Sequence, residues 1–258
     1  MEKKKVELIY QCTNCDCLIQ SALEFGGDKD GEMRWSDGKK KKHFQWGHPE
    51  LMICLRCKEL LWLKKLKPLV QNRDKVFQLG WTQYKNAQPA RWIRPKEAKE
   101  LLKQSVLANS PEEEYIRKHL WWGDNERIDP WTGDWYKTYN DGLDIRNDMY
   151  GEDDMAFYRA NCRSLISIFH FALDKLLEEV DRLSEESEAE REYIEEFYSE
   201  DIHERIFMLC ELYRNLGEFE NADRMLKRVK GSRYAAIVRQ IEKAIRRRNK
   251  FTFQLKNN

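Results

Sequence analysis

Four cysteines near the start of the chain have the spacing of metal ligands. Cys12 and Cys15 form one C-x-x-C pair, and Cys54 and Cys57 form a second. Thiolates are soft, charged donors that hold Zn²⁺ tetrahedrally at about 2.3 Å, and two-residue spacing lets both sulfurs of a turn face one ion. A redox C-x-x-C, or two buried thiol pairs, does not explain why the motif occurs twice. We therefore predict a structural zinc ion held by these four cysteines.

The identity of the metal and of one ligand stays open at this stage. Iron in a rubredoxin-like site uses similar turns and is the rival metal. Cys17 gives the first motif the form C-x-x-C-x-C and could replace Cys15, although we interpret Cys17 as a packed or free thiol. His43 and His48 could also substitute. Four cysteines leave no open position for a catalytic water, so we interpret the site as structural.

Short strands are expected to bring the two cysteine pairs together. Val6–Tyr10 leads into the first pair and Leu51–Ile53 leads into the second, as strands that feed turns do. Asp16 and Lys58 stand where such turns often carry glycine, and aspartate tolerates a left-handed backbone better than lysine. These features predict a small antiparallel zinc ribbon over residues 1–66.

The segment between the cysteine pairs and the region after the ribbon are less regular. A polar insert runs from Gly26 to Pro49, and Trp35-Ser36-Asp37-Gly38 within it has the pattern of a hairpin turn. We interpret the run Lys39–Lys42 as a solvated loop tip. Residues 67–154 form a tryptophan-rich connector that ends in a long loop over Asp124–Asp154.

Two helices are predicted within the connector. The first begins at Pro95 and runs to about Leu107, because proline suits the first helical turn. The second begins after Ser110-Pro111, where serine caps the helix and acids follow. It is expected to stop at Gly123.

From Met155 to the end the pattern is helical. One helix carries an apolar stripe and runs into the acidic segment Ser184–Glu192, which is either its exposed extension or a break. The stripe consists of Cys162, Leu165, Ile166, Phe169, Leu173, Leu176, Leu177 and Val180. Further helices are predicted over residues 201–216, 218–230 and 232–249, divided by Gly217 and Gly231.

Part of this region has the spacing of a tetratricopeptide-type helical hairpin. The matching residues are Ile206, Leu209, Cys210, Tyr213, Gly217, Phe219, Ala222, Leu226 and Val229. Small residues at 210 and 222 let two helices approach closely, and Gly217 permits a tight turn. A hairpin of an ordinary helical bundle is the alternative.

Three segments carry a resemblance to a known family. They are the two cysteine turns with the Trp35–Gly38 insert, His119–Arg127, and Glu211–Phe219. Together they resemble a family of uncharacterised bacterial zinc-ribbon proteins. The resemblance implies an architecture and a metal, but no reaction.

Charge and composition indicate where the protein acts. The chain has 258 residues and a net charge of +1, which hides a basic region up to Lys103, an acidic block at Glu178–Glu204 and a basic tail at Arg224–Lys256. The first residues lack the apolar stretch of a secretory signal, and no segment has the length of a membrane span. Seven cysteines, an odd number, argue against a disulfide framework. We expect a cytoplasmic protein.

No catalytic motif is present: the sequence has no phosphate loop, no H-E-x-x-H and no nucleophile–base pattern among its five histidines. Cys162 and Cys210 lie on apolar faces and are expected to be core residues. Trp121 and Trp122 are interpreted as packing between helices rather than as a stacking surface for bases or sugars.

The predicted fold class is α+β, with the ribbon, the connector and a tetratricopeptide-like helical domain over residues 155–258. The predicted function is a non-catalytic adaptor that binds another protein. The alternatives are a nucleic-acid-binding protein that uses the basic ribbon half and Arg246-Arg247-Arg248, and an enzyme with a site in the 124–154 loop. For those arginines we expect the acidic block to act as an internal partner.

Overall fold

The structure is a computed structural model that describes residues 4–25, 33–34, 36, 40–41, 51–71, 86–89, 91–93, 95–103, 107–128, 152–250, 252–253 and 255. Most of the polar insert, His43, His48 and residues 129–151 of the predicted long loop lie outside these ranges. The chain divides into two compact units. The first comprises Met1–Glu32 with Lys41–Glu113, and the second comprises Met33–Lys40 with Glu114–Asn258.

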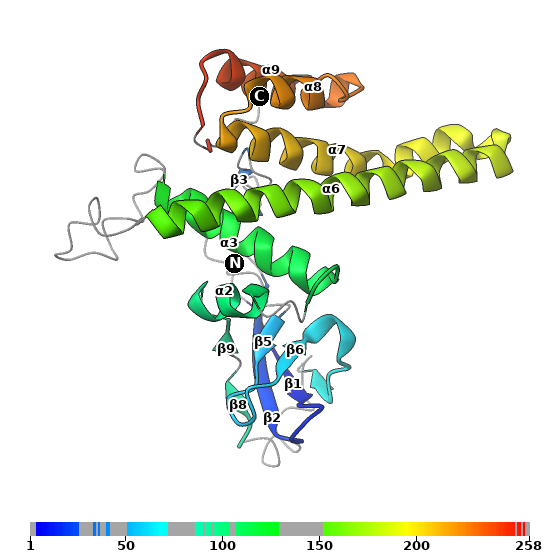
Figure 1. The fold of residues 1–258 in the computed structure, drawn as a ribbon. Helices are drawn as coiled ribbons and strands as arrows, with labels where there is room; N and C mark the ends of the chain where they lie inside the picture. The colour runs from blue at the N-terminus through cyan, green and yellow to red at the C-terminus, as the bar shows by residue number, and fades with distance from the viewer. Residues whose placement is uncertain are drawn as a thin grey trace. The chain divides into compact units, whose positions relative to one another are not determined.

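Two small sheets organise the first unit (Figure 1). The strands are β1 (Lys4–Gln11), β2 (Leu18–Phe25), β5 (Leu51–Ile53), β6 (Leu60–Trp62), β7 (Val70–Gln71), β8 (Gln88–Pro89) and β9 (Arg91–Trp92). Their orders are β7-β1-β2-β8 and β6-β5-β9. Each sheet contains one antiparallel hairpin that ends at a cysteine pair, with Gln11 opposite Leu18 in one and Ile53 opposite Leu60 in the other. The strands predicted to lead into the cysteine turns are confirmed.

The core of the first unit lies directly behind the cysteines. Leu8 and Tyr10 alternate along β1, and Cys12 follows directly after the strand in the same alternation, so one side of this segment carries both core side chains and the first predicted ligand. The same buried cluster includes Ile19, Met52, Cys54, Leu61 and Leu63. A short 3-10 helix, η1 (Leu63–Lys65), follows β6.

Two helices follow the sheets in the chain, α2 (Pro95–Lys103) and α3 (Pro111–Ile128). α2 begins at the predicted proline, but Leu107 lies in the turn before α3, so α2 is shorter than predicted. The predicted cap of α3 is confirmed, because the Glu113 backbone N–H donates to Ser110 Oγ at 3.2 Å.

The prediction that α3 stops at Gly123 is wrong, because the helix continues to Ile128. Glycine inside a helix costs only about 1 kcal/mol relative to alanine, and packing offsets this cost. Asp124 and Asn125, which follow Gly123, are both 4% exposed. Asn125 Oδ1 accepts a hydrogen bond from the Tyr158 hydroxyl at 2.9 Å, which ties the last turns of α3 to the next helix.

A long antiparallel helix pair, α6 (Glu152–Glu186) and α7 (Arg191–Leu216), forms the centre of the second unit (Figure 1). The predicted stripe of α6 is confirmed, since Cys162, Leu165, Phe169 and Leu173 are fully buried. The acidic segment is a break rather than an extension: α6 ends there, and the 3-10 helix η3 (Glu188–Glu190) leads into α7.

α7 begins ten residues before the predicted start at residue 201. Its buried residues begin only at His203, so the prediction missed first turns whose apolar residues Tyr193, Ile194, Phe197 and Tyr198 do recur at helical spacing. Those turns are held by polar contacts. Arg191 Nε donates to Glu195 Oε1 at 2.9 Å, and the Tyr198 hydroxyl donates to Glu179 of α6 at 3.2 Å.

The predicted helical hairpin after α7 is confirmed. α8 (Phe219–Leu226) turns back along α7, followed by η4 (Ser232–Tyr234) and α9 (Ala235–Arg246). Gly217 ends α7 in the left-handed region, with φ of 80°. Cys210 Sγ lies 3.4 Å from the Ala222 carbonyl oxygen, the close approach expected of small residues. That this hairpin belongs to the tetratricopeptide type stays a prediction.

The α+β class is confirmed, with the β7-β1-β2-β8 and β6-β5-β9 sheets in the first unit and the long helices in the second. A short two-stranded sheet, β3 (Met33–Arg34) with β4 (Lys40–Lys41), flanks the predicted hairpin turn at residues 35–38. Within the described part of the chain, no helix is both long and apolar enough to cross a bilayer.

Candidate metal centre

The four predicted cysteines come together in the first unit. Their sulfur atoms all lie within 4.8 Å of one another, and Cys12 and Cys54 are fully buried. The Cys12 and Cys57 sulfurs are 3.6 Å apart, and the Cys15 and Cys54 sulfurs are 3.7 Å apart. Each of these distances joins one cysteine turn to the other, so four donors from two hairpins converge on one point.

The sulfur–sulfur distances fit one tetrahedral metal ion. Four sulfurs at about 2.3 Å from a central zinc would be separated by about 3.8 Å along each edge of the tetrahedron. The two distances above differ from this by no more than about 0.2 Å. All cysteines are free thiols, so no disulfide uses these donors. The cluster can therefore hold a metal ion, and a set of four thiols suits zinc or iron.

The two cysteine turns have the same backbone geometry. In the first, the Asp16 N–H donates to the Cys12 carbonyl at 3.1 Å, and in the second the Lys58 N–H donates to the Cys54 carbonyl at 2.9 Å. Asp16 and Lys58 have φ of 57° and 64°, so both adopt the left-handed conformation considered from the sequence.

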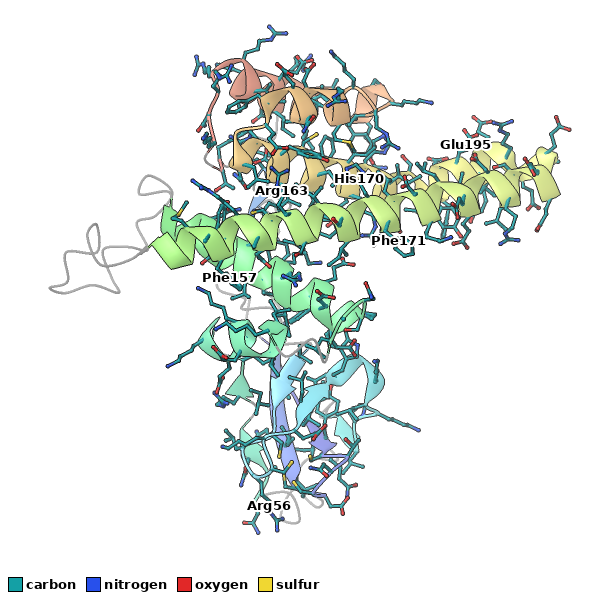
Figure 2. All side chains as sticks on the ribbon, viewed as in Figure 1. Arg56, Phe157, Arg163, His170, Phe171 and Glu195 are labelled. Carbon is teal, nitrogen blue, oxygen red and sulfur yellow. The ribbon has the colours of Figure 1, made fainter. Side chains whose placement is uncertain are left out.

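Local side-chain contacts stabilise these strained positions. Asp16 Oδ1 accepts from Gln11 Nε2 at 3.1 Å, and Lys58 Nζ donates to the Leu55 carbonyl at 3.0 Å. Both contacts span only a few residues, so each turn supports its own left-handed residue. Arg56, between the second pair of cysteines, is exposed and projects away from the cluster (Figure 2).

The surroundings of Cys54 favour its thiolate form. Burial opposes ionisation, but hydrogen bonds from the Cys57 backbone, the Cys17 thiol and the Arg56 backbone outweigh it and lower the pKa of Cys54 to about 6. Burial raises the pKa of Cys12 to about 12. Because the thiolate is the form that binds metal, Cys54 is more readily available as a ligand near neutral pH than Cys12.

Cys17 lies beside the cluster but outside the four-sulfur group. Its sulfur is 3.2 Å from that of Cys54, which is shorter than the tetrahedral edge of about 3.8 Å. The set of mutually close donors contains Cys15 and does not contain Cys17. This geometry favours Cys15 as the ligand and Cys17 as a neighbouring thiol.

The other cysteines and tryptophans singled out from the sequence are core residues where the structure describes them. Cys162 and Cys210 are fully buried, and burial raises the pKa of both thiols. Trp121 is fully buried, and its indole N–H donates to Asn215 Oδ1 at 3.0 Å. The packing role predicted for Trp121 is therefore confirmed.

The expected pairing of Arg246, Arg247 and Arg248 with the acidic block is not seen among the described residues, where Arg246 lies 3.7 Å from Glu242 of its own helix. Arg233, earlier in the basic tail, does lie 3.9 Å from Glu200 of the block, and other acids of the block pair with Lys175, Arg182 and Arg191. Residues three or four positions apart on a helix lie side by side regardless of tertiary packing, and this spacing explains the ion pairs formed within one helix.

Two polar features of the second unit were missed from the sequence. Glu211 and Arg214 form a fully buried ion pair that Ser36 joins. Arg159 and Arg163, four residues apart on α6, contribute to a cavity at one end of the unit. Their i, i+4 spacing was the available signal, since it places both cations on one helix face.

Comparison with known proteins adds no identification: no protein-family model, curated protein or solved structure matches this chain. The resemblance to bacterial zinc-ribbon proteins therefore stays a prediction.

Proposed function

We propose that this protein is a non-catalytic adaptor, in which a zinc-loaded ribbon stabilises the first unit and the helical unit binds a partner protein. The donor set supports a structural metal, because four thiolates leave no position for a substrate or a catalytic water. Zinc is the proposed metal, since it accepts four thiolates in tetrahedral geometry without redox chemistry.

The observation that carries the adaptor role is an exposed aromatic cluster at the closed end of the α6–α7 hairpin. Tyr193 and Phe197 are 70% and 67% exposed, with ring centroids 6.4 Å apart. Tyr198 meets Phe197 edge-on, at 5.2 Å between centroids. Burying such rings is favourable, and exposed aromatic side chains are typical anchors of protein–protein interfaces.

The charge around this cluster specifies the partner's chemistry. Exposed acids surround the cluster at Glu185, Glu186, Glu188, Glu190, Glu192, Glu195, Glu196 and Glu200. The nearby Arg182 and Arg191 are already paired with Glu186 and Glu195 (Glu195 is labelled in Figure 2). We therefore propose a partner that presents an apolar recess rimmed by lysine or arginine, because complementary charge speeds and orients association.

Capture of the tagged full-length protein from its own host, followed by mass spectrometry of bound proteins and nucleic acids, tests the adaptor role. The informative variant is Tyr193→Ser with Phe197→Ser, and the control is Phe171→Ser. Phe171 is also 67% exposed but lies near the middle of α6 (Figure 2). A true partner should be retained by the control and depleted at least tenfold by the double variant.

The same partner, purified, should bind the wild-type protein in fluorescence anisotropy with an affinity that falls as salt rises, because the proposed contact is partly electrostatic. Equal capture by wild type and the Tyr193/Phe197 variant would reject this surface as the adaptor site.

Nucleic-acid binding is the alternative, and the exposure of the basic tail favours it. The Arg246 side chain is 80% exposed, and its only ion pair among the described residues is the local one with Glu242. If the tail binds nucleic acid, neutralising Arg246, Arg247 and Arg248 together should weaken binding and flatten its salt dependence, because each phosphate contact releases a counterion. An enzymatic site in the 124–154 loop remains a second alternative, and most of that loop lies outside the described residues.

A further inference from the structure

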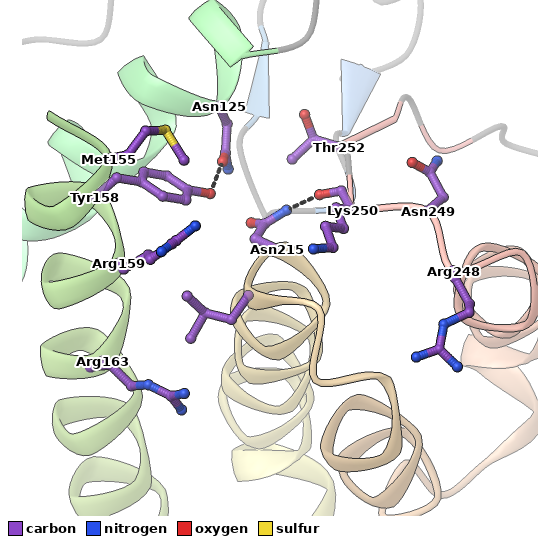
Figure 3. A pocket seen from close by; sticks show the side chains of 11 residues that line it. Asn125, Met155, Tyr158, Arg159, Arg163, Asn215, Arg248, Asn249, Lys250 and Thr252 are labelled. Carbon is purple, nitrogen blue, oxygen red and sulfur yellow. Dashed lines mark hydrogen bonds between the residues drawn. The ribbon is translucent and has the colours of Figure 1, made fainter. Parts of the chain in front are cut away.

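The second unit contains a cavity of about 590 Å³ at the end of α7 opposite the acidic hairpin end (Figure 3). Four segments form it: the end of α3, the start of α6, the end of α7 and the residues that follow α9. The lining side chains used below are Arg159, Arg163, Asn215, Leu216, Arg248 and Lys250. This volume lies in the range of small-molecule sites, which is about 300–1,000 Å³.

The lining of this cavity is positively charged. Among the residues whose side chains the structure describes, it includes three arginines and one lysine and no acidic residue. Arg163 is paired with Glu218. Within the described part of the chain, Arg159, Arg248 and Lys250 form no ion pair. Cations gathered in a recess without counter-charges attract anions.

The two cations that follow α9 are held in place by the fold. Arg248 has φ of 51° at the end of α9, a left-handed conformation that non-glycine residues rarely adopt. Its guanidinium lies 5.1 Å from the centre of the Phe219 ring. The Lys250 side chain runs across Gly217, where a Cβ atom would stand only 2.9 Å from Nζ.

Backbone contacts fix the same segment against α7. The Asn215 side-chain amide donates to the Lys250 carbonyl at 2.5 Å, and Arg214 donates to the Asn249 carbonyl. Figure 3 shows Arg159 and Arg163 projecting from α6 on one side of the cavity, and Lys250 and Arg248 coming from the segment after α9 on the other.

The cavity also has neutral and apolar walls. Met155 and Leu216 contribute apolar surface, and Tyr158 lies beside Asn125, to which its hydroxyl donates. A ligand that carries both a multiply charged anionic group and an apolar organic group fits these walls better than an inorganic ion, because the ion would leave the apolar surface uncovered. A recess of this size also holds one small molecule rather than a polymer backbone, which would need a continuous groove.

We propose that this cavity binds a small organic phosphate monoester, with the phosphate between Arg159 and Lys250 and the organic group against Met155 and Leu216. Guanidinium groups suit phosphate because their planar N–H donors match two phosphate oxygens at once. The site is separate from the metal cluster and from the acidic hairpin end, and gives the protein a ligand beyond the proposed adaptor role.

Isothermal titration calorimetry of the full chain with adenosine 5′-monophosphate, inorganic phosphate and adenosine tests this assignment. The monophosphate and inorganic phosphate should bind, the monophosphate more tightly, and adenosine should bind at least tenfold more weakly than the monophosphate. If inorganic phosphate binds as tightly as the monophosphate, the anion site is supported, and the organic group of the ligand is not an adenosine. No heat from either phosphate up to millimolar concentration would overturn the proposal.

Variants separate this pocket from general attraction to a basic surface. Arg159→Gln with Lys250→Gln should weaken monophosphate binding at least tenfold, whereas Arg246→Gln with Arg247→Gln removes the same charge nearby and should change it less than twofold. Arg159→Gln alone is a second pocket variant, should the double variant fail to fold by circular dichroism. Equal weakening by both double variants, or tighter binding of a single-stranded oligonucleotide than of the monophosphate, would reject the pocket in favour of diffuse binding to nucleic acid.

Discussion

Ser36 Oγ donates a hydrogen bond to Glu211 Oε2 at 2.9 Å, although the two residues are 175 positions apart. Both are essentially excluded from solvent, at 1% and 0% exposed. Glu211 also pairs with the fully buried Arg214, and Ser36 Oγ accepts from the Phe253 backbone N–H at 3.1 Å. One serine from the Trp-Ser-Asp-Gly segment thereby completes a buried charge network and holds the C-terminal segment.

Ser36→Ala should destabilise the second unit by about 1–3 kcal/mol, because it removes a donor from a buried carboxylate and an acceptor from the partly buried Phe253 N–H. Thermal melting of the variant measures this loss. Ser167→Ala is the matched control, since Ser167 is exposed and, among the described residues, its hydroxyl bonds only to the carbonyl of Arg163 within its own helix. Equal melting temperatures for wild type and Ser36→Ala would mean that a water molecule replaces the Ser36 hydroxyl in its hydrogen bonds to Glu211 and Phe253.

The purified protein should contain about one zinc per chain, and strong chelators should release it with loss of the first unit's fold. Metal binding supplies folding energy in such sites, because an unfolded chain offers no preformed set of ligands. Cys54→Ser should abolish binding, as Cys54 is a fully buried member of the four-sulfur group. Elemental analysis checks both statements, and either an absence of metal or a red, iron-containing protein would contradict the zinc assignment.

Cys17→Ser should leave zinc content unchanged, whereas Cys15→Ser should reduce it strongly. The reason is geometric, since Cys15 belongs to the set of sulfurs within 4.8 Å of one another and Cys17 does not. Because Cys17 lies only 3.2 Å from Cys54, the comparison must be made on both variants under one protocol. Greater metal loss in the Cys17 variant than in the Cys15 variant would mean that Cys17 is the metal ligand and Cys15 the neighbouring thiol.

Ala222→Phe should destabilise the helical unit by about 1–3 kcal/mol while the metal site stays filled, because overpacking forces two close helices apart. Ala222 is fully buried against Cys210. Thermal melting together with metal content tests this, with Ala156→Phe on the exposed side of α6 as the control. An unchanged melting temperature for Ala222→Phe would mean that Ala222 does not lie in the contact between the two helices.

Glu218→Gln should cost less than about 1 kcal/mol at neutral pH, since the Arg163 partner is 59% exposed and solvent screens the pair. The hydrogen bond from Arg163 lowers the pKa of Glu218 below the ordinary 4.5. Its stabilising contribution is therefore fully present above about pH 4.5 and is lost as pH falls through the lower folded pKa.

The difference in melting temperature between wild type and Glu218→Gln should shrink in that acidic range. Glu220→Gln, on the exposed side of the same helix, should show no comparable difference. A difference that is independent of pH would assign the effect to packing rather than to charge.

Much of this protein's local structure is readable from short stretches of sequence. The cysteine spacing, the Ser110-Pro111 helix start and the turn at Gly217 depend on backbone geometry over a few residues, and each was confirmed. The apolar stripe of α6 is equally local, because helical periodicity alone places its members on one face. The sequence by itself therefore determined the metal-ligand candidates, the α+β class and the main helices.

Only the tertiary structure decided how distant polar groups meet. The start of α7 is held by contacts with α6 and by an ion pair along its own turns, and α3 continues past Gly123 because Asn125 bonds to Tyr158. The meeting of Ser36 with Glu211 depends likewise on the path of the whole chain. A residue's type and near neighbours specify its backbone preferences, whereas its partners across the chain follow from how the helices pack, and no single sequence pattern records that packing.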